Sequence, residues 1–293
     1  MPGLSVFFAL FILLFSTPAF AASAKQFSLG LGIDYARGDF HTDSTSTYTT
    51  YPLVFDWLPN ERFNLELTVP FVKQTSSNTH SMGSGHMGSG TMGTGSNMAT
   101  VKSATTSPSA MVTSQGMMGG AGNGVMLPSG ENQSGVGDTT LAGAYNLLLD
   151  GEATPNLAVT GYLKFPTADK DKGLGTGAFD WGPGLLLSKR LGDWQPFTEG
   201  RYVLQGGSRE EIGARNYFLA DVGLGYIWKE NLSNALFCRV GTRAFAGMAP
   251  PLEMRLKTVW GFSENTSAEF YLLKGLSDGS PDLGGGMSIS VGF

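Results

Sequence analysis

The sequence is poor in cysteine, in charge and in long apolar runs. Its only cysteine is Cys238, so no internal disulfide can staple the fold, and we expect that thiol to be a small apolar side chain on a strand. Charged residues make up 15% of the 293 residues, against about 25% in average soluble proteins. No run after the N-terminal segment reaches the ~18 apolar residues of a spanning helix. These absences exclude a disulfide scaffold and a helical membrane protein, and they leave only strands to cross a membrane.

The first residues are predicted to be an export signal. An apolar run over residues 6–15 is broken by Ser16-Thr17-Pro18 and followed by Ala19-Phe20-Ala21, a small-x-small cleavage site. No Lys or Arg precedes the run, so only the N-terminal amine supplies positive charge there. Because the run is too short to span a bilayer, a cleaved signal peptide over residues 1–21 is favoured over an uncleaved anchor. We expect the mature chain to comprise residues 22–293.

The rest of the sequence is a succession of period-2 segments separated by turn residues. In the clearest of them, Phe63 and Leu65 alternate with Asn64 and Glu66. The even number of such segments is typical of bacterial single-chain membrane barrels. Twelve strands are predicted, over residues 26–36, 44–57, 62–72, 137–148, 156–165, 179–190, 195–205, 215–228, 232–244, 252–262, 266–274 and 283–293.

The connections between these strands alternate in length. Every second connection is a tight turn of a few residues, such as 58–61 or 229–231. Short turns on one side and long loops on the other are the pattern of an outer-membrane barrel, in which the short turns face the periplasm. The longer connections are 37–43, 73–136, 166–178, 206–214, 245–251 and 275–282.

One face of the predicted strands is apolar, and the other carries charges of both signs. In residues 252–257, apolar and charged side chains alternate at every position. Unpaired backbone groups are costly in hydrocarbon, so only a closed ring of strands is tolerated there. We therefore predict an all-β fold, a single antiparallel transmembrane β-barrel with its charges inside. The predicted lumen-lining residues are Glu66, Lys164, Glu199, Arg201, Asp221, Arg239, Arg243, Glu253, Arg255, Lys257 and Glu269.

Aromatic residues mark the ends of the strands. Indoles prefer the depth of the lipid headgroups, so the tryptophans are predicted to form interface girdles in contact with outer-membrane lipid. The last predicted strand alternates apolar residues and ends on Phe293, which is characteristic of chains that the barrel-assembly machinery recognises. The tryptophans at or near strand ends are Trp57, Trp181, Trp194, Trp228 and Trp260.

Three segments resemble one known family. Their order and spacing are similar to those of the outer-membrane β-barrel family named for the MetA pathway of phenol degradation. The resemblance implies a transporter or channel for aromatic or other hydrophobic compounds, and it is best over 135–293 and weaker over 26–72. The insertion between the third and fourth strands departs from the family pattern. The resembling segments are 135–141, 163–167 with 173–177, and 187–192.

The long connection over 73–136 is low in complexity and rich in Met, Gly and Ser. A five-residue unit recurs at 81–85, 86–90 and 91–95. Such a composition buries too little apolar surface to order itself, which predicts a flexible extracellular loop. A second hypothesis is a soft-metal site, since thioethers suit Cu(I) and imidazole suits several metals. Its ligands would be His80, Met82, His86, Met87 and Met92.

Nothing in the sequence favours catalysis. Serine hydrolysis requires a histidine beside the nucleophile, and His41, His80 and His86 all fall in or beside predicted loops. No G-x-S-x-G segment occurs, and residues 173–177 lack the Lys-Ser/Thr of a phosphate loop. We therefore expect a non-enzymatic passive channel that takes up small solutes, without a cofactor or a nucleic-acid partner. The alternative is a non-conducting structural or interaction barrel that displays its Met/His-rich loop outside.

Overall fold

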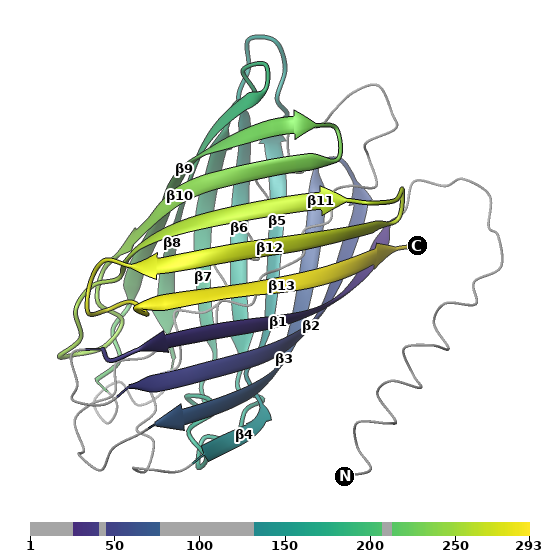
Figure 1. The fold of residues 1–293 in the computed structure, drawn as a ribbon. Coiled ribbons are helices and arrows are strands. Elements are labelled where there is room, and N and C mark those ends of the chain that lie inside the picture. Colours follow the sequence, from purple (N-terminus) through teal and green to yellow (C-terminus); the bar gives the residue numbers. More distant parts are fainter. Residues whose placement is uncertain (1–25, 41–44, 77–131, 207–212) are drawn as a thin grey trace.

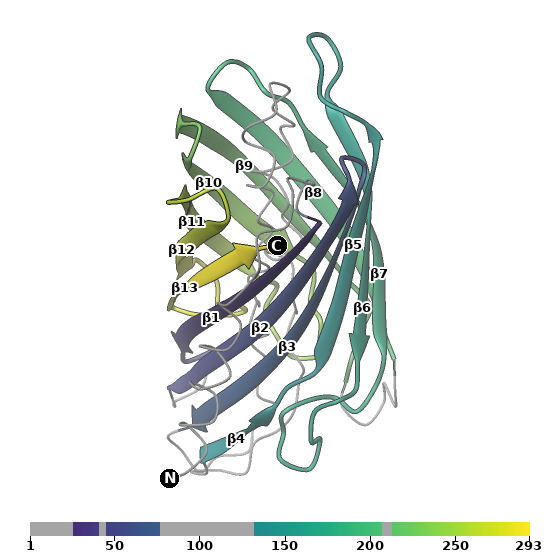
Figure 2. The ribbon, with the colours of Figure 1, turned by 90° about the vertical axis from the view of Figure 1, so that its right-hand side faces the viewer.

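A single antiparallel sheet that closes on itself forms the protein. The computed structural model describes residues 26–40, 45–76, 132–206 and 213–293, and these contain strands and turns but no helix (Figure 1). The tilted strands wind around a central axis, as Figure 2 shows. The strands are β1 (Phe27–Gly38), β2 (Ser46–Asn60), β3 (Phe63–Ser76), β4 (Asn132–Val136), β5 (Thr139–Leu148), β6 (Asn156–Phe165), β7 (Asp180–Ser188), β8 (Trp194–Gln205), β9 (Tyr217–Lys229), β10 (Leu232–Gly241), β11 (Leu252–Gly261), β12 (Thr266–Gly275) and β13 (Leu283–Gly292).

The ring is closed by β1, which pairs with β2 on one side and with β13 on the other. The short strand β4 pairs with the C-terminal half of β3, while β5 pairs with its N-terminal half. Between them the Gly137 amide donates to the Pro70 carbonyl at 2.9 Å, so β4 and β5 occupy one place in the ring. The barrel therefore has twelve strand positions, and the predicted fold is confirmed.

The structure moves several of the predicted boundaries, most of all where β3 and β4 extend into the predicted loop. Strand β3 continues to Ser76 and β4 begins at Asn132, so the ends of the predicted loop 73–136 belong to the barrel wall. Their ladder pairs Phe71 to Thr75 with Val136 to Asn132. Trp194 begins β8, one residue before the predicted start of that strand. The predicted signal peptide over 1–21 and most of the Met-rich connection lie outside the described residues.

Side chains alternate between the two faces of the wall as the sequence predicts. Leu256 is 43% exposed on the outside, whereas Arg255 beside it is 8% exposed. Leu67 is also exposed, and Glu66 is buried. Apolar side chains thus face outward, where lipid would replace water, and ionic side chains face the barrel interior.

Aromatic side chains gather at the end of the barrel that carries the short turns. Trp194 and Trp228 are exposed and both pack edge-on against Tyr226, with ring centroids 4.7 Å apart in each pair. Phe27 and Phe293 stack at 6.2 Å where the first and last strands meet. This arrangement matches an interface girdle. Among the described residues, no helix has the length and apolarity that a membrane span needs.

Candidate permeation surface

The predicted inner residues lie where the strand alternation places them, with one exception. Arg243 lies two residues beyond the end of β10 and is exposed, so the prediction that it lines the lumen is wrong. Beyond the last ladder pair the backbone no longer alternates regularly, and counting by two fails. The ten buried residues are Glu66, Lys164, Glu199, Arg201, Asp221, Arg239, Glu253, Arg255, Lys257 and Glu269.

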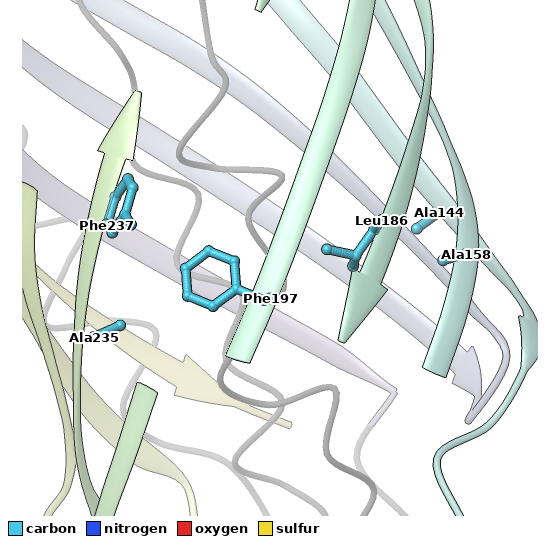
Figure 3. Close-up of a cluster of buried hydrophobic side chains, with 6 residues drawn as sticks. All are labelled: Ala144, Ala158, Leu186, Phe197, Ala235 and Phe237. Atoms are coloured by element: carbon cyan, nitrogen blue, oxygen red, sulfur yellow. The ribbon is translucent and has the colours of Figure 1, made fainter. Parts of the chain in front are cut away.

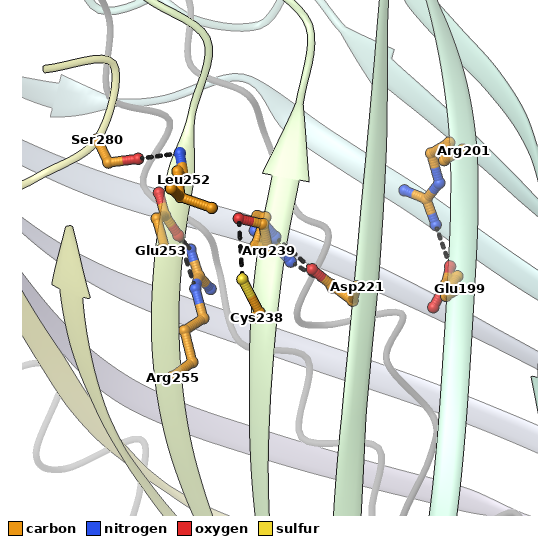
Figure 4. Close-up of polar contacts among 9 residues, drawn as sticks. All are labelled: Glu199, Arg201, Asp221, Cys238, Arg239, Leu252, Glu253, Arg255 and Ser280. Carbon is orange, nitrogen blue, oxygen red and sulfur yellow. Dashed lines mark hydrogen bonds and ion pairs between the residues drawn. The ribbon is translucent and has the colours of Figure 1, made fainter. Parts of the chain in front are cut away.

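The inner face of β8 to β12 carries ion pairs between neighbouring charged side chains, and we call it the paired wall. Arg239 lies directly opposite Asp221 in the β9–β10 ladder and donates two hydrogen bonds of 2.9 Å to its carboxylate. Figure 4 shows this pair between neighbouring strands. Because charges buried without partners are costly, close pairing is what makes this wall possible. The remaining pairs are Arg201–Glu199 at 3.4 Å, Arg255–Glu253 at 2.6 Å and Lys257–Glu269 at 2.6 Å.

The inner face of β1 to β3 carries carboxylates instead. Asp56 and Glu66 lie opposite each other in the β2–β3 ladder. Ser28 donates to Asp56 at 2.7 Å and Thr68 donates to Glu66 at 3.2 Å. Among the described residues, no Lys or Arg forms an ion pair with Asp34, Asp56 or Glu66. We call these three residues the carboxylate wall.

A third group of charges lies toward the long loops. The Lys164 ammonium is 2.6 Å from an Asp180 oxygen and 3.5 Å from an Asp138 oxygen. All three residues are buried. Of these three residues only Lys164 was predicted to face the lumen, and Asp34 and Asp56 were not predicted either. Strand parity could have found these two, since each lies on the face opposite the apolar side chains of its strand.

Apolar side chains flank the paired charges on the same inner face. Toward the short turns, Leu186, Phe197 and Phe237 project into the interior (Figure 3), with the two phenyl rings 5.9 Å apart. Toward the long loops, Tyr162 and Tyr217 pack in a second cluster with Val203 and Leu219. We call these the lower and the upper apolar cluster. Neither cluster was predicted, because alternation alone does not rank positions along a strand.

The buried charges between the two apolar clusters form what we call the charged belt. The upper cluster is in direct contact with this belt. The Arg201 guanidinium carbon lies 5.2 Å from the centroid of the Tyr162 ring, a cation–π contact. A solute that crosses the barrel would meet aromatic, then ionic, then aromatic groups.

The buried charges are unbalanced. Nine carboxylates face five cationic groups among the described residues. The interior is therefore formally acidic. The carboxylates are Asp34, Asp56, Glu66, Asp138, Asp180, Glu199, Asp221, Glu253 and Glu269, and the cations are Lys164, Arg201, Arg239, Arg255 and Lys257.

The family described as "Putative MetA-pathway of phenol degradation" matches residues 39–226, more than half of the chain. The chain belongs to this family. The match covers the first half of the barrel more fully than the resembling segments suggested, and it ends within β9. A search of curated proteins found no match.

A solved structure at a TM-score above 0.5 has the same fold as this family member. The COG4313 outer membrane channel from Pseudomonas putida F1 is similar with a TM-score of 0.62 at 17% identity, over 94% of this chain and 99% of that one. The KdgM porin gives a TM-score of 0.49 at 8% identity, over 91% of this chain and 99% of that one. The P. putida toluene transporter TodX gives 0.42 at 10% identity, over 94% and 91%. The first of these supports an outer-membrane barrel.

The hypothesis of a metal site in the MetA-pathway family member falls outside the described residues. His80, Met82, His86, Met87 and Met92 all lie within 77–131. Among the described residues, no group of three or more His, Cys, Asp or Glu is arranged to hold a metal ion. The thioether site therefore stays a prediction, and Cu(I) titration of the full chain with and without methionine substitutions would test it.

Proposed function

We propose that this protein is a passive outer-membrane channel for small solutes, with a preference for neutral or cationic compounds that contain an aromatic or other hydrophobic part. The observation that supports this most strongly is the layering of the inner face. A belt of buried charges lies between the two apolar clusters inside a closed ring of strands. A twelve-position ring is wider than the eight-stranded barrels that side chains fill completely.

The layers suit solutes with an apolar ring and a polar substituent. Aromatic pairs add about 0.5–1.5 kcal/mol beyond the burial of their area, so Phe197, Phe237 and Tyr162 can each hold a ring weakly and briefly. The charged belt provides donors and acceptors for a hydroxyl group on the way. Weak successive contacts favour conduction, because a channel must also release the solute that it binds. The family description, which names phenol degradation, supports the same solute class.

Planar-bilayer recordings of the full mature chain test the proposal. Discrete conductance steps are expected, together with a concentration-dependent reduction of ion current by phenol and a weaker one by a sugar of similar size. Complete absence of conductance would contradict the channel and favour the non-conducting barrel with a displayed loop. N-terminal sequencing of protein from outer membranes would test the cleavage after Ala21 separately.

A further inference from the structure

A buried lysine at the long-loop end joins two of the three sequence segments that resemble the family. Lys164, which is 2% exposed, ends the inner row of β6. Its ammonium has three N–H donors, and it donates to Thr176 at 2.7 Å while also pairing with Asp180 and Asp138. The partners come from the β4–β5 junction, from the connection after β6 and from the start of β7. Three chain segments thus meet at one ammonium group.

The connection over 166–179, which we call the rim loop, is held across the edge of the barrel. At its start, Thr167 donates to the Gly137 carbonyl at 2.9 Å, and the Ala168 amide donates to Asp138 at 3.0 Å. Further along, the Gln74 side chain donates to the Gly173 carbonyl at 3.0 Å. The rim loop joins β6 to β7, yet it reaches back past β5 to β3. Its position is therefore fixed by the neighbouring strands β3 to β5 as well as by its own strands, and the buried Gln74 and Lys164 side chains hold it on the inner side of the wall.

Two glycines of the rim loop occupy positions where a side chain would not fit or would strain the backbone. A Cβ on Gly175 would lie 2.6 Å from one carboxylate oxygen of Asp138 and 2.6 Å from Cβ of Ala168. Only glycine lets the backbone approach Asp138 so closely. Gly173 has φ of +70°, in the left-handed region that glycine adopts without strain. Leu174 between them is buried.

We propose that Lys164 is a positioning residue that holds the rim loop over the long-loop mouth and so sets the width of the entrance. The inference rests on the proposed channel function. Without the ammonium, two buried carboxylates, Asp138 and Asp180, would repel each other next to the loop that they anchor. Asp180 also accepts the Gly206 amide at 3.0 Å, so the end of β8 would lose a hydrogen-bond anchor as well. The rim loop would then leave the rim, and the mouth would widen.

The first test compares Lys164→Met with Lys189→Met. Lys189 pairs with Asp150 at 3.2 Å at the short-turn end, so K189M removes a lysine ion pair far from the rim. K164M is expected to raise single-channel conductance by about twofold or more and to admit larger neutral polymers, because the entrance is wider. K189M is expected to match the wild type. Equal conductance and equal size limits in K164M and the wild type would overturn the proposal.

Two further variants separate the loop from the charge. Gly175→Val should produce the same large conductance with every charge retained, whereas Gly161→Ala, whose Cβ would meet nothing within 4 Å, should not. In a background with Cys238→Ala, Gly135→Cys and Leu174→Cys can tie the rim loop to β4. A Cβ on Gly135 would already lie 2.7 Å from a methyl carbon of Leu174.

The disulfide provides a rescue that a merely structural role would not show. In the K164M background, oxidation should return the conductance to the wild-type value, and reduction should raise it again. If the wild type does not conduct at all, the proposed function fails, and the rate of disulfide formation still tests the rim loop. Faster formation with Lys164 than with K164M, at the same final yield, would support its positioning role. Equal rates in the two backgrounds would overturn it.

Discussion

The inner face of β1 to β3 and the inner face of β8 to β12 both bury carboxylates, but only the second pairs them with cations. In the second, each cation lies against a carboxylate, and Arg239 donates one hydrogen bond to each carboxylate oxygen of Asp221. In the first, Asp56 faces Glu66, and hydroxyl groups supply the hydrogen bonds. The charges on the face of β8 to β12 therefore cancel pair by pair, whereas those on the face of β1 to β3 do not. Burial of charge alone therefore does not tell what a wall does.

The two walls differ in how far their electric fields extend into the barrel interior. The fields of two opposite charges about 3 Å apart largely cancel a few ångströms away, so an ion pair contributes shape and stability. Carboxylates without a cationic partner project their field into the interior and raise the local concentration of cations. We expect the paired wall to govern the stability of the barrel and the carboxylate wall to govern which ions pass.

The largest expected effect is on stability, from breaking a pair. Arg239→Met leaves Asp221 buried without its partner, and this should lower the free energy of unfolding by about 3–5 kcal/mol. The double variant Arg239→Met with Asp221→Leu should recover most of the loss, because it removes both charges. Urea unfolding in lipid vesicles measures both. A single variant as stable as the wild type would show that the pair is not needed.

The carboxylate wall should respond in the opposite manner. Asp56→Asn with Glu66→Gln removes two like charges, so stability should be kept or improved while the cation-to-anion permeability ratio falls severalfold toward unity. Reversal potentials in a salt gradient measure the ratio. Glu230→Gln, in an exposed short turn, is the matched control and should change neither property. A ratio that stays at the wild-type value in the double variant would assign selectivity to other residues.

The smallest expected effect concerns aromatic solutes. Phe197→Ala should weaken the block of ion current by phenol by about twofold to tenfold, since one aromatic contact adds roughly 0.5–1.5 kcal/mol. Phe270→Ala removes an exposed ring on the outer face and should leave the block unchanged. The same experiment with a sugar separates ring contacts from pore size. If the two variants behave alike, the lower apolar cluster does not contact the solute.

The sequence predicts the wall of the barrel well and the contacts inside it poorly. Period-2 alternation identified all twelve strand positions of the ring and ten of the fourteen buried charges, because each residue's face depends only on its own strand. The partners of those charges depend on the register between strands. Lys164 meets Asp138 and Asp180 only because three segments converge at the rim, and no local pattern encodes this. Arg243 was misplaced where the ladder ends.

The most direct test of this account is the reversal potential of the wild-type channel in a tenfold salt gradient across a planar bilayer. The account predicts discrete conductance steps that reverse at a potential of the sign set by cations, because the interior carries an excess of carboxylates. Steps that reverse at the potential set by anions would contradict it.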